Sequence, residues 1–184
     1  MQKIIRWASS EGEGLEQLHL TVDDRGVRAR SVVVGGDAEE ATTWAIGYEV
    51  ECDPLWRVRR VKIWDTTTGN DFELLADGSG NWTGPDGQPR PEFAGCLDVD
   101  IRATPFTNTL PVRRLSLKPG ETASIRVLYI PLPELDPFPV VQHYTKLGPQ
   151  VYRYESESRD FVRDLTLDGE GLVIDYPGLF HRTL

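Results

Sequence analysis

Apolar and polar residues alternate along much of the chain. Residues 18–22 carry an apolar side chain at every second position, and residues 44–52 repeat this period of two. Such alternation is typical of β-strands with one buried face. Further strands are predicted where β-branched and aromatic residues cluster, at 72–75, 97–101, 125–130, 151–155, 161–167 and 172–176. The pattern therefore predicts a mainly β fold.

Interruptions of the alternation predict a bulge and several turns. In a further predicted strand, residues 56–64, the apolar phase slips by one residue at Arg59 and Arg60. A β-bulge, which adds one residue to a strand, explains such a slip. The strand spacing is that of a meander, and positive φ angles are tolerated by the Asp- and Gly-rich stretches 23–26, 77–80 and 168–171. We expect the last of these to form a tight hairpin.

Helix signals are scarce, and two segments compete for them. In residues 107–115, capping residues precede Pro111, and Val112 and Leu115 share a helical face. In residues 139–148, an apolar stripe also fits a helix that ends at a glycine. We prefer the first segment. The pattern as a whole predicts mostly antiparallel strands in a meander, with little helix.

Length and composition indicate one ordinary globular domain. The chain has 184 residues, of which 39% are hydrophobic and 27% charged, which suffices for a core without disulfide staples. The Pro- and Gly-rich stretches 84–91 and 131–139 could separate two domains, but neither side carries a complete set of strands. We therefore expect a single domain over residues 1–184.

Charge and local composition exclude several classes of protein. The net charge of −9 disfavours electrostatic binding to nucleic acid phosphates. No apolar run reaches the length of a signal peptide or a transmembrane helix, so we expect a cytoplasmic protein. Two cysteines and three scattered histidines are too few for a disulfide framework or a metal site. Nucleophile-elbow and nucleotide-binding motifs are absent, so no cofactor is expected and an enzyme is disfavoured.

One pair of acids stands out as candidate chemistry. Asp98 and Asp100 alternate with Leu97, Val99 and Ile101, so a strand places both acids on one face, roughly 7 Å apart. On a concave face they could bind sugar hydroxyls, hold a hard cation, or act as acid and base across a glycosidic bond. On a solvent-facing side they would have no such role, and this alternation is normal for a one-sided sheet.

Other residues are weaker candidates, each with a structural alternative. Asp53 and Asp175 end strand-like runs beside prolines and could add charge to a pocket, although turn chemistry alone selects Asp there. Trp56 and Tyr176 could stack on sugars or contact acyl chains, although most aromatics of a β domain are core. Arg114 could clamp a phosphate group, although a helix C-terminus also favours arginine.

Longer runs of residues resemble a known family. Residues 95–101 (Gly-Cys-Leu-Asp-Val-Asp-Ile) and 103–115 (Ala-Thr-Pro-Phe-Thr-Asn-Thr-Leu-Pro-Val-Arg-Arg-Leu) look like the signature of the putative glycolipid-binding family of bacterial proteins. Runs at 48–50 with 56–59, and at 171–180, agree with it in order. The resemblance covers roughly residues 40–182, and the first 40 residues match only loosely.

The resemblance implies a fold, a partner and a ligand. It implies a large curved antiparallel sheet wrapped around a single α-helix, a homodimer, and remote similarity to lipoprotein localisation factors. It also implies an acidic pocket, glycolipid or phospholipid binding, and a role in glycolipid metabolism. Our candidate ligand-binding residues are Asp53, Trp56, Asp98, Asp100, Asn108, Arg114, Asp175 and Tyr176.

Three hypotheses follow. The first is a non-catalytic binder whose curved sheet encloses a lipid, with acids hydrogen-bonded to sugar hydroxyls. The second is a hydrolase or isomerase of a glycosylated substrate, in which two of the carboxylates provide acid and base. The third is a dimeric interaction module without a small ligand.

Overall fold

The described strands form one continuous sheet. The computed structural model describes residues 1–10, 12, 14–37 and 42–184. Within them, fourteen strands are ordered β7-β6-β5-β4-β3-β2-β1-β14-β13-β12-β11-β10-β9-β8. Their bounds are β1 Gln2–Ser9, β2 Leu15–Asp23, β3 Gly26–Asp37, β4 Thr42–Cys52, β5 Val58–Asp65, β6 Asp71–Ala76, β7 Trp82–Thr83, β8 Asp98–Ile101, β9 Thr122–Ile130, β10 Phe138–Gly148, β11 Val151–Ser156, β12 Val162–Leu167, β13 Val173–Tyr176 and β14 Phe180–Arg182.

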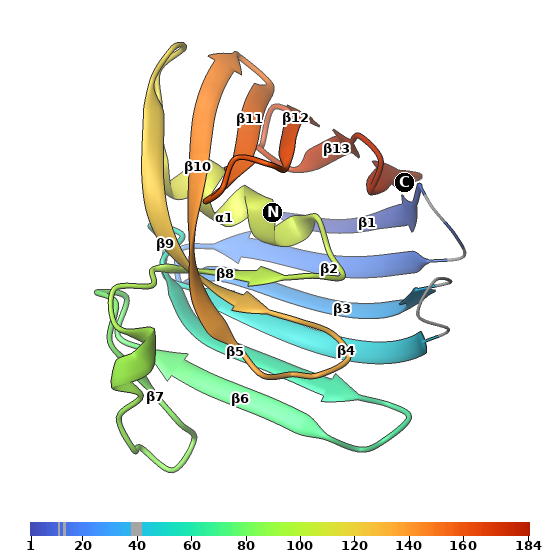
Figure 1. The fold of residues 1–184 in the computed structure, drawn as a ribbon, viewed down its shortest axis with the longest axis vertical. Coiled ribbons are helices and arrows are strands. Elements are labelled where there is room, and N and C mark those ends of the chain that lie inside the picture. Colours follow the sequence, from blue (N-terminus) through green and yellow to red (C-terminus); the bar gives the residue numbers. More distant parts are fainter. Residues whose placement is uncertain (11, 13, 38–41) are drawn as a thin grey trace.

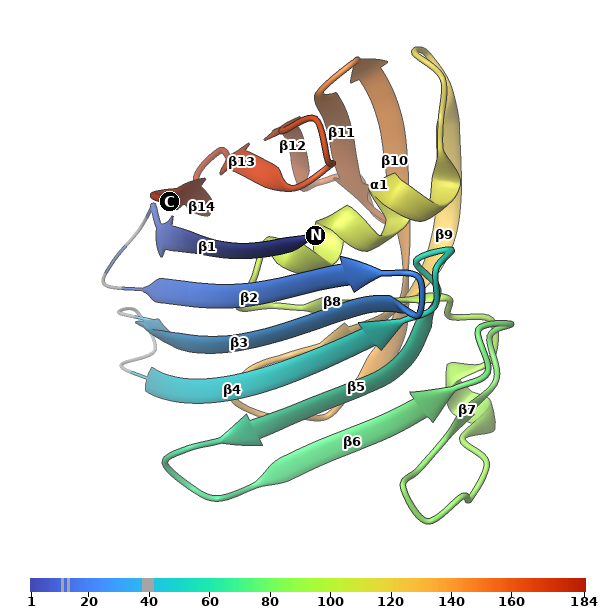
Figure 2. The same cartoon turned by 180° about the vertical axis from the view of Figure 1, so that it is seen from behind.

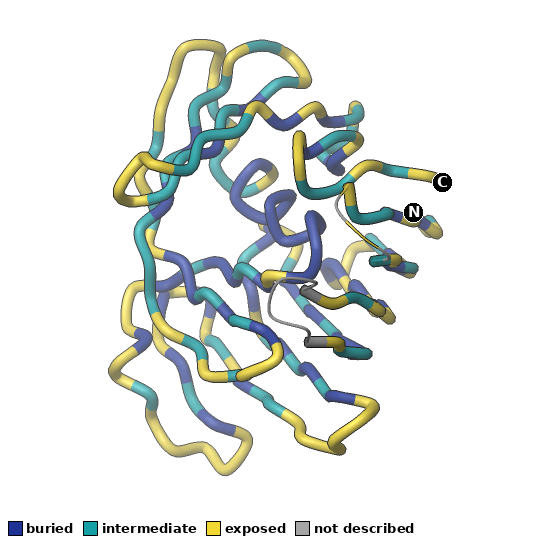
Figure 3. Tube along the Cα trace, turned by 45° about the vertical axis from the view of Figure 1, so that its right-hand side comes forward, coloured by how far each residue is buried: buried dark blue, intermediate teal, exposed yellow. Residues whose placement is uncertain are grey.

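The sheet curves so that its two halves face each other across one helix. Figures 1 and 2 show β1 to β6 on one side, β9 to β13 on the other, and α1 (Thr109–Leu115) between them. The start of the helix is buried, as the dark trace at the centre of Figure 3 shows. A 3₁₀ turn, η2 (Phe106–Asn108), leads into α1, and another, η1 (Pro91–Phe93), precedes β8. The predicted curved β fold around a single α-helix is thus confirmed.

The pairing departs from the expected pattern at one end of the sheet. Between the described strands, every pair is antiparallel except β8 with β9, where Asp98 lies opposite Val127 and Asp100 opposite Tyr129 in parallel register. Val99 belongs to the same apolar cluster as core residues of β4 and β5. Strand β8 therefore lies across the concave surface, between the two halves of the sheet.

The helix prediction was correct in position and wrong in one detail. Residues 109–115 form α1, whereas the competing segment lies in β10. Asn108 occupies the N-cap position, but its side chain makes no capping hydrogen bond. Its amide instead donates to the Tyr144 hydroxyl at 2.9 Å, because the buried start of α1 faces β10. The expected capping role is therefore absent.

The predicted bulge is present in β5. Glu51 pairs with Arg60 while Cys52 pairs with Val58, so Arg59 is the extra residue on β5. The insertion explains why apolar positions on both sides of Arg59 can face the same core. Every strand predicted from the sequence is found, and the Pro- and Gly-rich stretches 84–91 and 131–139 connect strands of the same sheet.

The two faces of the amino-terminal half differ in chemistry. The concave face carries buried apolar residues such as Leu18, Ile46 and Ile63. The convex face carries ion pairs, in which Arg60 contacts Glu49 at 2.9 Å and Glu73 at 2.8 Å. These side chains are half-buried, and ion pairs that water still reaches stabilise a fold only weakly. Burial on the concave face therefore sets the register of these strands.

Candidate functional site

A cavity of about 420 Å³ lies between the two halves of the concave surface. Strands β1 to β4 provide one side of it, and strands β9, β11, β13 and β14 provide the other. Strand β8 and the residues that follow it provide its central wall. The volume falls within the roughly 300–1,000 Å³ of small-molecule sites. The curved sheet thus encloses a space of ligand size.

Glu16, on β2, is a buried acid on the wall of this cavity. It shares the inward phase of Leu18 and is 2% exposed. Its Oε1 accepts hydrogen bonds from Ser31 Oγ at 2.7 Å and Tyr48 Oη at 2.6 Å. Burial raises the pKa of this carboxyl from 4.5 to about 7, against the opposing effect of the Thr104, Tyr48 and Ser31 hydroxyls.

Two polar atoms on the cavity wall lack protein partners. Among the described residues, Glu16 Oε2 and Trp44 Nε1 are buried without a hydrogen bond. Both residues line the cavity. Buried polar groups are normally paired, and each one left unpaired costs about 1–3 kcal/mol. An acceptor and a donor are therefore left for a molecule bound in the cavity.

Asp100 is a second carboxyl on the same cavity, at the centre of its wall. Its Oδ2 accepts a hydrogen bond from Gln142 Nε2 at 2.6 Å, and its Oδ1 accepts one from Thr107 Oγ1 at 3.3 Å. Burial raises its pKa, and these two neutral donors oppose the rise only in part. No cation compensates its charge in the described environment. An ionised Asp100 is therefore an uncompensated negative charge.

A hydrogen-bonded network joins the two acids along the wall. Thr104 Oγ1 lies 3.2 Å from the Tyr48 hydroxyl, which donates to Glu16. The Thr104 carbonyl accepts from Thr107 Oγ1 at 3.4 Å, and Thr107 also reaches Asp100. Such networks fix the orientation of their members. The two carboxyls are thus held in place before any ligand arrives.

Aromatic rings form most of the remaining wall on the carboxyl-terminal side. Tyr154 lies 5.9 Å from Phe161 and 6.3 Å from Tyr176, measured between ring centroids. Tyr176 lies 6.3 Å from Phe180. All four rings line the cavity. Tilted and edge-on rings at these separations pack favourably and present flat apolar faces.

Two of the sequence-predicted residues form a structural ion pair instead of lining the cavity. Arg114 Nε lies 3.1 Å from Asp98 Oδ1, and Arg114 Nη2 lies 2.5 Å from Asp98 Oδ2. Asp98 is fully buried, and burial raises its pKa although Arg114 opposes the rise. The solvent-facing alternative is therefore wrong for Asp98. The pair anchors α1 to β8.

The other candidates divide between the cavity and the remainder of the molecule. Asn108 and Tyr176 line the cavity together with Asp100. Asp53 lies in a turn, where its carboxylate contacts Arg57 Nε at 2.7 Å. The remaining two also lie away from the cavity: Trp56, whose buried ring has Arg113 above it at 5.1 Å, and Asp175, which is half-buried in β13. The predicted binding roles of all eight residues remain predictions.

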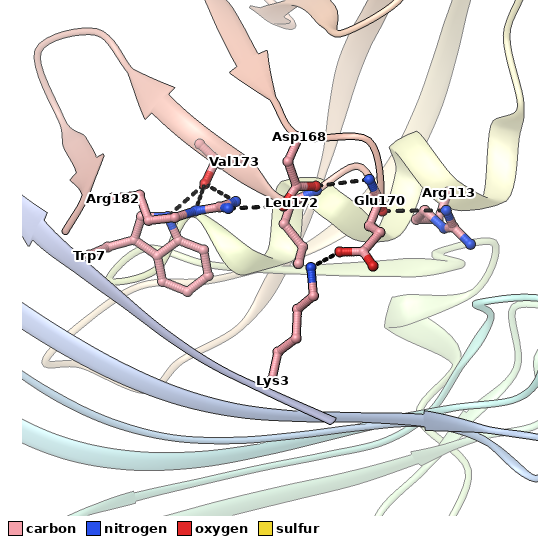
Figure 4. A network of polar contacts seen from close by, with 8 residues as sticks. All are labelled: Lys3, Trp7, Arg113, Asp168, Glu170, Leu172, Val173 and Arg182. Carbon is pink, nitrogen blue, oxygen red and sulfur yellow. Dashed lines mark hydrogen bonds and ion pairs between the residues drawn. The ribbon is translucent and has the colours of Figure 1, made fainter. Parts of the chain in front are cut away.

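A polar network attaches the β12–β13 hairpin to the amino-terminal half (Figure 4). Trp7 Nε1 and Arg182 Nε donate to the Val173 carbonyl at 2.8 Å and 3.0 Å. Arg182 also contacts Asp168 Oδ2 at 2.9 Å, and Lys3 of β1 contacts Glu170. These contacts hold the hairpin against β1. Tyr176 and Trp7 therefore keep their places on the cavity wall.

Sequence reasoning missed the most buried acid of the site. The alternation that defines Leu18, Leu20 and Val22 extends back by two residues to Glu16, which places that carboxyl on the buried face. An acid at a predicted core position is an informative signal. The cavity rings Tyr129 and Tyr154 had no such signal, because aromatics are common in any β core.

Neither a metal-binding cluster nor a membrane-spanning helix is found in the described part of the chain. Those residues include no group of three or more His, Cys, Asp or Glu side chains placed to hold a metal ion. Over the same residues, none of the helices is long and apolar enough to span a membrane. Cys52 and Cys96 are both buried free thiols.

The fold and the cavity define a mainly β protein whose curved sheet encloses a ligand-sized space beside one short helix. The chain belongs to the family described as "Putative glycolipid-binding", whose model matches residues 4–182. The match includes the first 40 residues, which sequence inspection related to the family only loosely. The chain is also similar to the crystal structure of a DUF1089 family protein from Pseudomonas aeruginosa, with 40% identity, 94% of each chain covered and a TM-score of 0.84. No curated protein matches it.

Proposed function

We propose that the cavity binds the polar head of a glycolipid and that the protein is a non-catalytic binder. The observation that carries this proposal is the unpartnered Oε2 of Glu16, which is buried on a cavity wall with Trp44 and a row of aromatic rings. Carboxylate oxygens accept hydrogen bonds from hydroxyl groups, and flat rings cover the apolar face of a sugar. The family name supports the same class of ligand.

The size of the cavity limits how much of a lipid it can hold. About 420 Å³ accommodates a single sugar or a comparable head group with part of an alkyl chain. We therefore propose that the remainder of the lipid extends beyond the cavity. In this proposal the buried Glu16 and the half-buried Asp100 make the site an acidic pocket for the head group.

The arrangement of cations favours a sugar over a phosphate head. Arg114 directs two of its nitrogens at Asp98, so they are occupied by that ion pair. Arg102 is the one cation among the described residues that line the cavity. Phosphate sites usually combine several charged or backbone donors. Two acids with unmet acceptor capacity fit a polyhydroxy ligand better.

A direct test is uptake of octyl β-glucoside, followed by native mass spectrometry and by tryptophan fluorescence. Trp7 and Trp44 line the cavity, so their emission should change on binding. We expect Glu16→Gln to weaken binding about tenfold, because it removes a charged hydrogen-bond acceptor. The matched control is Glu157→Gln, which changes an exposed acid outside the cavity. Absence of uptake by the unmodified protein would exclude the proposal.

A second candidate function is hydrolysis or isomerisation of a glycosylated substrate. The pKa of about 7 at Glu16 favours it, because a general acid works best when its pKa is near the ambient pH. Incubation with chromogenic glycosides distinguishes the two functions. A binder releases no product, whereas an enzyme should lose turnover by orders of magnitude in Glu16→Gln or Asp100→Asn.

We also propose that this function is carried out by a single-domain homodimer in the bacterial cytoplasm, as part of glycolipid metabolism. The dimer rests on the family resemblance of residues 95–115. Light scattering coupled to size-exclusion chromatography tests the dimer, and cell fractionation tests the compartment. A monomer at micromolar concentration would contradict the first statement, and recovery from a membrane or secreted fraction would contradict the second.

A further inference from the structure

Asp100 lies among aromatic rings that share its cavity. Three tyrosines of the cavity wall are close enough to respond to its charge. Burial and then the charge of Asp100 raise the pKa of Tyr154 and Tyr176, and the same two causes, in the same order, act on Tyr129. We call Tyr129, Tyr154, Phe161 and Tyr176 the aromatic enclosure. All four of its rings line the cavity together with Asp100.

Among the described residues, no cation is directed at this carboxylate. Gln142 and Thr107, its hydrogen-bond partners, are both neutral. Arg114 pairs with Asp98, and Arg163 lies over the Phe161 ring at 4.4 Å and donates to the Pro177 carbonyl.

The remaining charged residues of the cavity wall are Arg102 and Glu16. Arg102 is exposed and donates to the Leu132 carbonyl at 3.2 Å, and its charge affects Tyr129. Neither Arg102 nor Glu16 is among the groups that shift the pKa of Asp100. The negative charge of Asp100 is therefore left uncompensated within the described part of the chain.

A positively charged ligand group would interact favourably with both the aromatic enclosure and the uncompensated charge of Asp100. Aromatic faces attract a cation within about 6 Å of the ring centroid, with a gain of about 2 kcal/mol when the site is desolvated. A buried carboxylate gains a charge-assisted hydrogen bond from an ammonium group, which is roughly twice as strong as a neutral one. A neutral hydroxyl group could bond to Asp100 but would leave its charge uncompensated.

We propose that the head group bound in this cavity bears an ammonium group, which lies against Asp100 within the aromatic enclosure. This inference rests on the proposed function and specifies its ligand as an amphiphile with an amino-sugar or similar amine-bearing head. The sugar hydroxyls then face Glu16 and Trp44, whose unpartnered atoms lie on the same cavity wall.

The inference has a pH consequence with a definite sign. Burial raises the pKa of Asp100, so its carboxyl takes up a proton at higher pH than an exposed aspartate does. An ammonium group binds the ionised form. Affinity for an amine-bearing ligand should therefore fall as the pH decreases through the raised pKa, and binding at that pH should release a proton.

The test uses three probes with one alkyl chain: octyl β-glucoside, octyl 6-amino-6-deoxy-β-glucoside, and the N-acetylated form of the amine. Calorimetry at pH 7.5, below micelle-forming concentrations, should show that the amine binds at least tenfold more tightly than the other two. Asp100→Asn should abolish this preference. Asp164→Asn, which makes the same charge change on the exposed Arg153 pair, should preserve it.

A second variant keeps the test decisive if Asp100→Asn does not fold. Tyr129→Leu removes a half-buried ring of the enclosure and leaves Asp100 in place. It should weaken the amine more than the neutral glucoside. Equal binding of the charged and neutral probes, or a preference that survives Asp100→Asn, would overturn the inference while the proposed function stands. Failure of all three probes to bind would overturn both.

Discussion

The two acids of β8 lie two residues apart and have opposite surroundings. Asp98 is fully buried and is met by two nitrogens of the arginine fork, Arg114 Nε and Nη2. Asp100 faces the cavity and is met by an amide and a hydroxyl group. Desolvating a charge is expensive, so a partner must be supplied by the chain or by a ligand. The first acid is thus part of the fold, and the second is available for binding.

The largest effect expected from this comparison follows from removing the arginine. Arg114→Met leaves Asp98 buried without its counter-ion, and we expect a loss of about 3–5 kcal/mol in the free energy of unfolding. Urea denaturation measures it. The double variant Arg114→Met with Asp98→Leu should recover part of the loss, because no buried charge remains. Equal stability of Arg114→Met and the unmodified protein would show that the pair has no structural role.

An intermediate effect is expected from Glu16, the other acid of the cavity. Its folded pKa of about 7 exceeds its ordinary value of 4.5, so the folded state binds more protons than the unfolded state between these values. Stability therefore falls as the pH rises from 4.5 to 7, by an amount on the order of 3 kcal/mol. Urea titrations at pH 5 and pH 8 should show a smaller decrease in Glu16→Gln. If the decrease in stability is the same in Glu16→Gln and in the unmodified protein, the titrating group is a residue other than Glu16.

The smallest effect on stability is expected at Asp100. Asp100→Asn keeps the shape of the side chain and removes a charge that no cation in the described part of the chain compensates. We expect the free energy of unfolding at pH 8 to change by about 1 kcal/mol or less, in the stabilising direction. Urea denaturation measures this change, and Asp164→Asn, measured in the same way, is the control for removing one negative charge. A large loss of stability would mean that Asp100, like Asp98, is a structural acid.

Sequence alternation predicted the placement of these acids but not their partners. The period of two along β8 placed Asp98 and Asp100 on one face, and both acids do contact the η2–α1 segment. Which acid Arg114 would meet depends on how α1 packs across β8, and this is a tertiary contact. The sequence contains no local signal for that choice.

The remaining errors have similar causes. The segment that became β10 shows an apolar stripe compatible with a helix, and pairing with β9 and β11 decided its structure. Strand β3 was not predicted, because Ser31 interrupts its buried face. That serine is polar because it donates to Glu16. Polar residues that belong to the cavity wall and its hydrogen bonds thus interrupt the hydrophobic alternation, and this interruption is why β3 was not predicted.

The pairing of β1 with β14 has a kinetic consequence. Trp7 lies opposite Arg182 in that pair, so forming it closes almost the whole described chain into a loop. Contacts so distant in sequence form slowly compared with local hairpins. Trp7 and Phe180 line the cavity from these two strands, so the cavity is completed late in folding and lost early in unfolding. We therefore expect a bound ligand to act mainly by slowing the unfolding rate, with little effect on the rate of folding.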